Sequence, residues 1–284
     1  NMSEKLTEKA LLVSLSISQW GARVEDKKAT KEVETKFNAK KAGKFYKSLM
    51  EESAKEIAKI ASRARQYHYE NTLPWDKGRD VLLSENYLDY REKMADFERE
   101  MNHKVDEFVA RYEQEIEYEK QRLGGLFNIA DYPLPETLRT KYAFSVTPEA
   151  IQTADDFRVK LNDEEVDRIK KEITERLENR QKEAMRDVWK RLYDVVGHMA
   201  EKIKDKDIGK NVALHQSLID NITKLCDMLP KLNLTGDEEL DKMAKEIKES
   251  ITKYPVDDIR DYDNIRKHVI SETDKLLSKM DGFI

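Results

Sequence analysis

The strongest constraint on the fold is an apolar stripe that repeats every eleven residues in one segment of the chain. Its members are three or four residues apart: Tyr87, Tyr90, Met94, Phe97, Met101, Val105, Phe108, Tyr112 and Ile116. This spacing places them on one face of a helix. An eleven-residue period favours a nearly straight packing seam over a tight left-handed coil. With Ser84 as N-cap and Gly124 as stop signal, the pattern predicts a helix over residues 84–123.

A second long stripe predicts another helix over residues 163–203, opening at Asn162 or Asp163. Its members are Val166, Ile169, Ile173, Leu177, Ala184, Val188, Leu192, Val195, Met199 and Ile203. The two long helices flank a segment that is expected to hold short strands. We therefore expect them to return against each other as an antiparallel, coiled-coil-like hairpin.

The remaining segments predict a small sheet and shorter helices. Period-2 alternation indicates strands at residues 11–18, 142–146 and 157–161. Residues 26–69 are expected to be helical, with Gly43 as a point where two shorter helices could meet. Residues 71–78 form a turn, and shorter helices follow residue 210. The fold class is α+β, predominantly α-helical.

The expected domain organisation has a boundary in the polar stretch Lys204–Lys210. Residues 1–205 would hold the hairpin and a three-stranded sheet, and residues 206–284 the C-terminal helices. The alternative that both regions pack as one domain stays open.

Composition limits the function classes. The net charge is −5 with interleaved signs, which argues against a large non-specific nucleic-acid surface but leaves a local basic patch open. Cys226, the single cysteine, lies in an apolar run. This position indicates a buried thiol in a protein of a reducing compartment. No segment has the length of a membrane span. We expect a cytoplasmic protein without membrane association.

Motifs for catalysis are missing from the sequence. There is no glycine-rich phosphate loop and no HExxH. Asp194, His198 and Glu201 share a helix face, but such a group is an ordinary surface contact in an acidic chain, and zinc prefers three nitrogen or sulfur ligands. The sequence predicts no enzyme, metal or cofactor.

Two clusters are candidate binding sites. Trp and Arg in a turn resemble an interaction hot spot, and the candidate partner-binding residues are Pro74, Trp75, Lys77, Gly78 and Arg79. Alternatively, Trp75 folds back to cap the helices. Cations beside aromatic rings suit single-stranded nucleic acid, and these candidates are Arg63, Arg65, Tyr67, His68 and Tyr69. Alternatively, Tyr67 belongs to the packing stripe through Ala64.

Several segments together resemble an uncharacterised family encoded by tailed phages, prophages and integrative elements. The resemblance covers about residues 10–250 and is carried by five segments: Asn71–Arg79, Leu123–Phe127 with Asp131–Pro133, Ala154–Arg158, Ala184–Met185 with Trp189–Tyr193, and Leu229–Leu234. Gly125 stands where the family has an aspartate. Genes of this family lie near genes for MoxR-type AAA ATPases and for cobaltochelatase-like or von Willebrand factor A proteins, and in some cases near recombination genes.

The resemblance implies a non-enzymatic adaptor in the bacterial host cytoplasm that binds an AAA ATPase assembly or a host protein. The alternative is an accessory protein that binds single-stranded nucleic acid in phage DNA replication or recombination. The resemblance supplies no catalytic residues. Homo-oligomerisation is left open.

Overall fold

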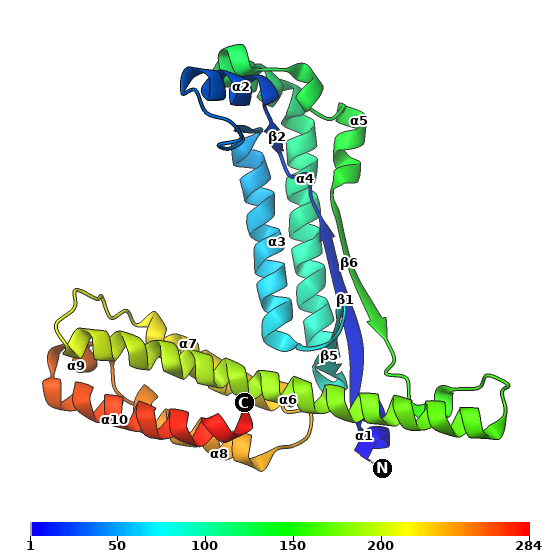
Figure 1. Ribbon diagram of the computed structural model, residues 1–284, viewed down its shortest axis with the longest axis vertical. Helices are drawn as coiled ribbons and strands as arrows, with labels where there is room; N and C mark the ends of the chain where they lie inside the picture. The colour runs from blue at the N-terminus through cyan, green and yellow to red at the C-terminus, as the bar shows by residue number, and fades with distance from the viewer. Residues whose placement is uncertain (1) are drawn as a thin grey trace. The chain divides into compact units, whose positions relative to one another are not determined.

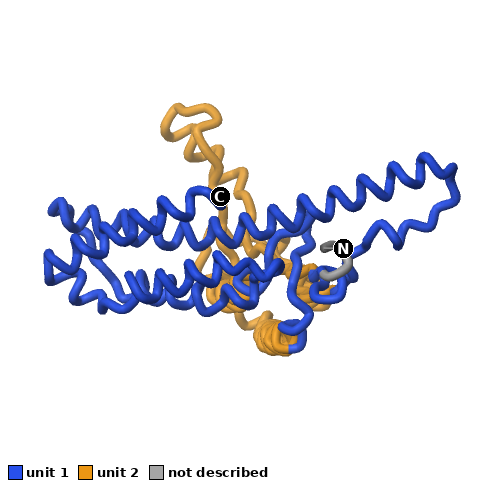
Figure 2. Tube along the Cα trace, turned by 90° about the horizontal axis from the view of Figure 1, so that it is seen from below, with its two compact units in different colours: residues 1–13, 69–88, 148–284 blue, residues 14–68, 89–147 orange. Residues whose placement is uncertain are grey.

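A computed structural model describes residues 2–284, with side chains described from Leu6 onward. The chain divides into two compact units, coloured separately in Figure 2. Of the described residues, unit 1 comprises 2–13, 69–88 and 148–284, and unit 2 comprises 14–68 and 89–147. The polar stretch Lys204–Lys210, where the sequence placed a boundary, lies within unit 1.

Unit 1 is a group of helices on a short part of the sheet. Its helices are α1 (Met2–Lys9), α6 (Asp163–Asp207), α7 (Ser217–Leu232), α8 (Glu238–Ile247), α9 (Val256–Asp261) and α10 (Asp263–Met280), with a π-helical turn at Lys248–Thr252 and 3-10 turns at Ser84–Asn86, Ala154–Asp156 and Asp281–Phe283. Helix α6 packs along α7 and α10 (Figure 1). Val188, Leu192 and Met199 of the predicted stripe are buried there. Cys226 is also buried, which raises its pKa to about 11.

Unit 2 is built on an antiparallel helix pair. Its elements are β2 (Arg23–Glu25), α2 (Lys27–Lys36), β3 (Tyr46–Ser48), α3 (Glu51–Asn71), most of α4 (Tyr87–Leu123), α5 (Pro135–Leu138), most of β6 (Ala143–Glu149), and 3-10 turns at Gly124–Leu126, Ile129–Asp131 and Arg139–Lys141. The eleven-residue stripe is confirmed as a buried seam from Tyr90 to Tyr112.

The partner of α4 in unit 2 is α3, which runs beside it (Figure 1). The Ser53 hydroxyl of α3 donates to Glu115 of α4 at 2.7 Å, and the Tyr67 ring packs on Phe97. Helix α6 has α7 and α10 as its neighbours in unit 1. The predicted hairpin of α4 with α6 is therefore not confirmed, because each long helix buries its stripe against a different partner.

The small antiparallel sheet has the strand order β4-β5-β1-β6, with β1 at Ala10–Ser18, β4 at Leu73–Asp76 and β5 at Arg79–Leu83. Ala10 pairs with Leu83 and Val13 with Asp80. The expected strands at 11–18 and 142–146 are confirmed as β1 and β6. The turn expected at 71–78 is a β4–β5 hairpin, and Gly78 supplies its positive φ of 70°.

Two expected elements are wrong. Residues 157–161 form no strand, and Val159 and Leu161 are 58% and 48% exposed, so their alternation has no core to face. Residues 26–69 are not one helix: α2 ends at Lys36, β3 follows, and α3 begins at Glu51. The break near Gly43 is confirmed, but the strand after it was missed.

Candidate functional site

The most distinctive surface of unit 2 is a lysine-rich segment around α2. Between residues 27 and 44 the chain has seven lysines, which we call the lysine cap, against only Glu32 and Glu34. The lysine cap consists of Lys27, Lys28, Lys31, Lys36, Lys40, Lys41 and Lys44, all exposed. Lys44 pairs with Glu25 at 2.9 Å. Within the described residues the other six form no ion pair, so their charges are left for solvent or a partner.

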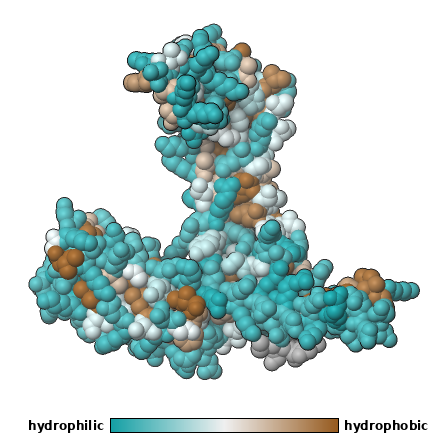
Figure 3. All heavy atoms as spheres, viewed as in Figure 1, coloured by the Kyte–Doolittle hydropathy of each residue, from teal (hydrophilic) through white to brown (hydrophobic). Residues whose placement is uncertain are grey.

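Aromatic side chains stand exposed among these lysines. Phe37, at the end of α2, is 70% exposed, and Phe45 and Tyr46 are 39% and 40% exposed. The guanidinium of Arg23 lies over the Tyr46 ring, 4.4 Å from its centroid. Helix α2 itself has no buried residue. Figure 3 shows mostly hydrophilic side chains over the end of unit 2 that carries α2, interrupted by separate hydrophobic ones.

Hydrogen bonds fix the path of the lysine cap. Asp26 is the N-cap of α2, and its Oδ1 accepts from the Ala29 amide at 2.9 Å. The amide of Phe45 donates to the Thr30 hydroxyl, and the amide of Lys41 donates to Glu34 at 2.7 Å. The loop between α2 and β3 is thereby tied back along the helix.

Backbone strain is concentrated in the same segment. Among the described residues, four non-glycine residues have positive φ: Ala22, Asn38, Lys41 and Met50, with φ between 45° and 53°. Each such residue costs on the order of 1 kcal/mol or more, and persists only where the surroundings over-determine it. All four lie between residues 22 and 50, so the rest of unit 2 must hold this segment in place.

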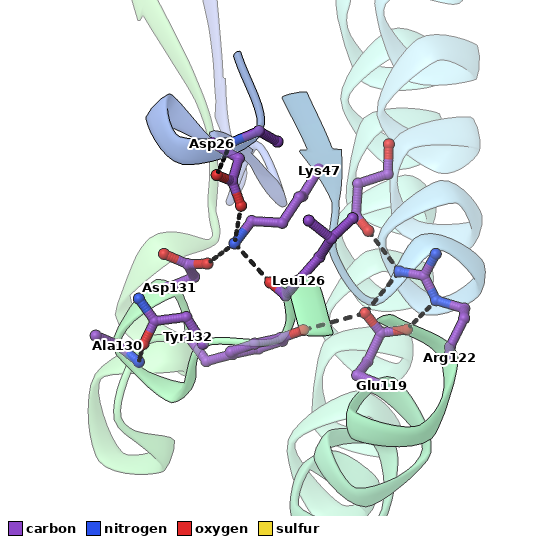
Figure 4. Close-up of polar contacts among 11 residues, drawn as sticks. Asp26, Lys47, Glu119, Arg122, Leu126, Ala130, Asp131 and Tyr132 are labelled. Carbon is purple, nitrogen blue, oxygen red and sulfur yellow. Dashed lines mark hydrogen bonds and ion pairs between the residues drawn. The ribbon is translucent and has the colours of Figure 1, made fainter. Parts of the chain in front are cut away.

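Two groups of buried polar contacts hold the segment of residues 22–50 in place, and the first is centred on Lys47 (Figure 4). The Lys47 side chain is 4% exposed, and its ammonium has three acceptors. It donates to the Leu126 carbonyl at 2.9 Å and lies 3.1 Å from Asp26 and 2.5 Å from Asp131. Because an ammonium has three donors, this centre is fully satisfied. It joins β3, the start of α2 and the turn after α4.

The second centre is the Glu119 carboxylate of α4, which is 2% exposed (Figure 4). Both of its oxygens accept from Arg122 at 2.7 Å, and Oε2 also accepts from the Met50 amide at 3.1 Å and from the Tyr132 hydroxyl at 3.2 Å. Arg122 in turn donates to the Ser48 carbonyl. Strained Met50 is therefore anchored through its own amide.

Electrostatics favour the charged forms at both centres. The Ala29 amide, followed by Lys47, lowers the pKa of Asp26. Burial alone would raise the pKa of Glu119, but Arg122 and the Met50 amide lower it overall. Burial alone would lower the pKa of Lys47, but Asp131 and Asp26 raise it. The hydrogen-bond and ion-pair partners therefore keep each of these groups in its charged form despite its burial.

An acidic groove flanks the Glu119 centre. It has a volume of about 540 Å³ and is lined by five carboxylates, Glu51, Glu52, Glu56, Glu115 and Glu119, with Arg111 and Arg122 as its cations. The end of unit 2 therefore carries a basic surface at α2 and an acidic one at the start of α3.

The predicted partner-binding residues lie on the β4–β5 hairpin of unit 1. Pro74, Lys77 and Gly78 are exposed, whereas Trp75 is 8% exposed and packs in the unit 1 core. Asp76 is clamped by Arg180 and Arg79, each at 2.7 Å, and Arg180 chiefly lowers its pKa. The hairpin borders a cavity of 310 Å³ in which arginines and carboxylates face each other. Trp75 takes the folded-back position of the two alternatives.

The predicted nucleic-acid cluster lies on the last turns of α3, where its groups have partners within the protein. Arg63 pairs with Glu100, Arg65 donates to the Ile17 carbonyl at 3.0 Å, and Tyr67 stacks on Tyr90. The imidazole Nδ1 of His68 lies 2.6 Å from the Tyr90 hydroxyl. Tyr69 is 51% exposed, and the Arg191 guanidinium lies over its ring.

The lysine cap is not among the sequence-predicted site residues, because the net charge of −5 with interleaved signs over the whole chain conceals a local excess of lysine. A window of eighteen residues over 27–44 would have found seven lysines against two glutamates. The burial of Lys47 had no such signal, since its acceptors Leu126 and Asp131 are about eighty residues away in the chain.

Comparisons with models of protein families, with curated proteins and with solved structures found no match for the chain. In the part of the chain that the structure describes, no three His, Cys, Asp or Glu residues gather as metal ligands. No described helix combines the length and apolar character needed to cross a membrane.

Replacing Lys47 should destabilise unit 2. Lys47→Met leaves Asp26 and Asp131 without their shared cation, which we expect to cost about 3 kcal/mol or more. Lys44→Met removes an exposed pair with Glu25 and should lower the urea midpoint much less than Lys47→Met does. Urea unfolding followed by circular dichroism compares the two. Equal losses would show that the Lys47 centre does not hold the segment.

Acid should weaken this end of unit 2 through Asp26 and Glu119. Both have a lowered pKa in the fold, so their stabilisation is present above the ordinary values of 3.8 and 4.5 and is lost as the pH falls through the lowered values. Lys47, whose pKa is raised, stabilises below its ordinary 10.5 and loses this effect above it.

The double variant Asp26→Asn, Glu119→Gln should therefore show a smaller fall in urea midpoint than the unmodified protein between about pH 5 and about pH 2.5. The exposed change Glu117→Gln is the matched control and should leave the pH profile unaltered. Parallel profiles for the double variant and the unmodified protein would contradict the assignment.

Proposed function

We propose that this chain is a non-enzymatic interaction protein that docks a macromolecular partner through the lysine cap. The observation that carries the proposal is the coincidence of six lysines without an acid partner and a Phe37 side chain that is 70% exposed. Neither feature contributes to folding, because the lysines repel one another and the ring remains in water. A partner with acidic groups and flat apolar or aromatic groups would satisfy both.

The buried centres support docking because they preorganise the surface. A loop that must be ordered on binding loses affinity, whereas a fixed surface avoids that cost. The Lys47 centre fixes the middle of β3, and the Glu119 centre fixes the chain just after the strand through the Met50 amide. Thr30 and Glu34 tie down the loop before β3. Strain held in place at a surface is typical of binding sites.

The resemblance to a phage and mobile-element family supplies the context for this proposal. An adaptor in an AAA ATPase assembly would present the lysine cap to an acidic face of the ATPase or of a host protein. Charge complementarity would steer the encounter and select the partner. The nucleic-acid alternative uses the same surface, since phosphates also supply regular negative charge.

Site-specific photo-crosslinking in a bacterial host tests the docking surface. A photo-reactive phenylalanine analogue in place of Phe37 should capture a discrete partner, and the triple change Lys36→Glu, Lys40→Glu, Lys41→Glu should abolish the capture by charge repulsion. The same analogue at Tyr118, which is exposed on α4, is the control and should not give that product. Equal products at both positions, or capture that survives the charge reversal, would sink the proposal.

A further inference from the structure

We infer that the lysine cap binds single-stranded nucleic acid. This inference rests on the proposed function, because it names the partner class of the same docking surface. Four structural features support it: lysines without an acid partner, exposed aromatic rings, a fixed backbone and the neighbouring acidic groove.

The cations match a phosphate backbone. Lys27, Lys28 and Lys31 lie on the first turns of α2, and Lys36, Lys40 and Lys41 lie at its end and in the loop that follows. Helix α2 has ten residues, about 15 Å of helix, so the charges extend along a line rather than around one point. Evenly spaced phosphates can pair with lysines arranged in this way, and pairing releases the counterions condensed on the nucleic acid, which favours binding.

The exposed rings match unpaired bases. Phe37 lies at one end of α2, and Phe45 is held beside its first turns by the bond from its amide to Thr30. Tyr46 adds a ring with the Arg23 guanidinium over one face. Bases in a single strand can stack on rings of this kind irrespective of sequence, whereas bases in a duplex already stack on each other.

Two other kinds of partner, an acidic protein and an anionic membrane surface, fit this surface less well. The centre of a protein interface is depleted in lysine and presents a continuous apolar area, but here Val33 and Phe37 are separated from Phe45 and Tyr46 by charged residues. A membrane-surface helix needs a continuous apolar face, and α2 supplies only Ala29 and Val33 ahead of Phe37.

The acidic groove limits where a strand can lie. Its five carboxylates stand beside Met50, at the other end of the segment from α2. A polyanion would be repelled there, so the strand should follow α2 and the loop rather than the start of α3.

Fluorescence anisotropy with a labelled oligothymidylate of twenty nucleotides tests this inference on the full chain. About five lysine–phosphate contacts would give a slope of about −3.5 in log affinity against log salt, or roughly a hundred-fold weaker binding at 200 mM than at 50 mM salt. The triple change Lys36→Gln, Lys40→Gln, Lys41→Gln should reduce the slope by about 2.

Two further variants separate the roles of charge and stacking. Phe37→Ala should weaken binding roughly five- to a hundred-fold and leave the salt slope unchanged, because it removes a ring and no charge. Lys36→Arg, Lys40→Arg, Lys41→Arg should retain the affinity, which excludes misfolding as the cause of a loss. The control is Lys242→Gln, Lys245→Gln, Lys275→Gln, whose lysines pair with acids in unit 1, and it should bind like the unmodified protein.

Several outcomes would overturn the inference. Absence of binding at 50 mM salt, equal loss in the unit 1 control, or binding only to vesicles of anionic lipid would each do so. If the oligonucleotide fails but the crosslink at position 37 captures a protein through the lysines, only the single-strand inference is lost. If both experiments fail, the docking surface itself is refuted.

Discussion

The structure of unit 2 depends on one buried ammonium. The Lys47 side chain is 4% exposed, so its charge is compensated by the Leu126 carbonyl, Asp26 and Asp131 together. Those three groups come from the start of α2 and from the 3-10 turns Gly124–Leu126 and Ile129–Asp131. The same contact therefore positions the helix that carries the exposed lysines and the turns that follow α4. With the Glu119 centre on the other side of β3, it holds a segment in which four residues have strained backbone.

The charge pattern sets this segment apart from the long helices. Along α4 and α6 many cations have an acid three or four residues away, as Lys104 has Glu107 and Lys190 has Asp194, so those faces are largely neutralised. Helix α2 has only two glutamates, and one of them, Glu34, is used by the loop amide of Lys41. Uncompensated charge therefore remains on a fixed backbone, beside aromatic rings that the core does not use. Binding to a partner gives these features a common explanation.

Periodicity predicted the elements of the fold but not all of their partners. The stripe from Tyr90 to Tyr112 indicated a buried helix face, and the structure confirms it, because side-chain spacing alone decides which face is apolar. Spacing within α4 could not decide which helix covers that face, and the expected partner, α6, is not the one that does so in unit 2, where α3 runs beside α4. Alternation found β1 and β6 but also suggested a strand at 157–161, where no core exists. The candidate site was harder to predict. Two of the three acceptors of Lys47, Leu126 and Asp131, lie about eighty residues away in the chain, and Trp75 contacts helix α6, about a hundred residues further on.

Hydrogen exchange at two backbone amides tests most directly whether the buried centres hold the segment of residues 22–50, which carries the lysine cap, in place. The Leu49 amide donates to the Ala22 carbonyl at 2.7 Å, and the Met50 amide donates to buried Glu119. If the centres hold the segment, both amides should exchange as slowly as those in the middle of α4. Exchange of both at the rate of an unprotected, fully solvated amide would show that the segment opens freely, and would contradict the account of a preformed binding surface.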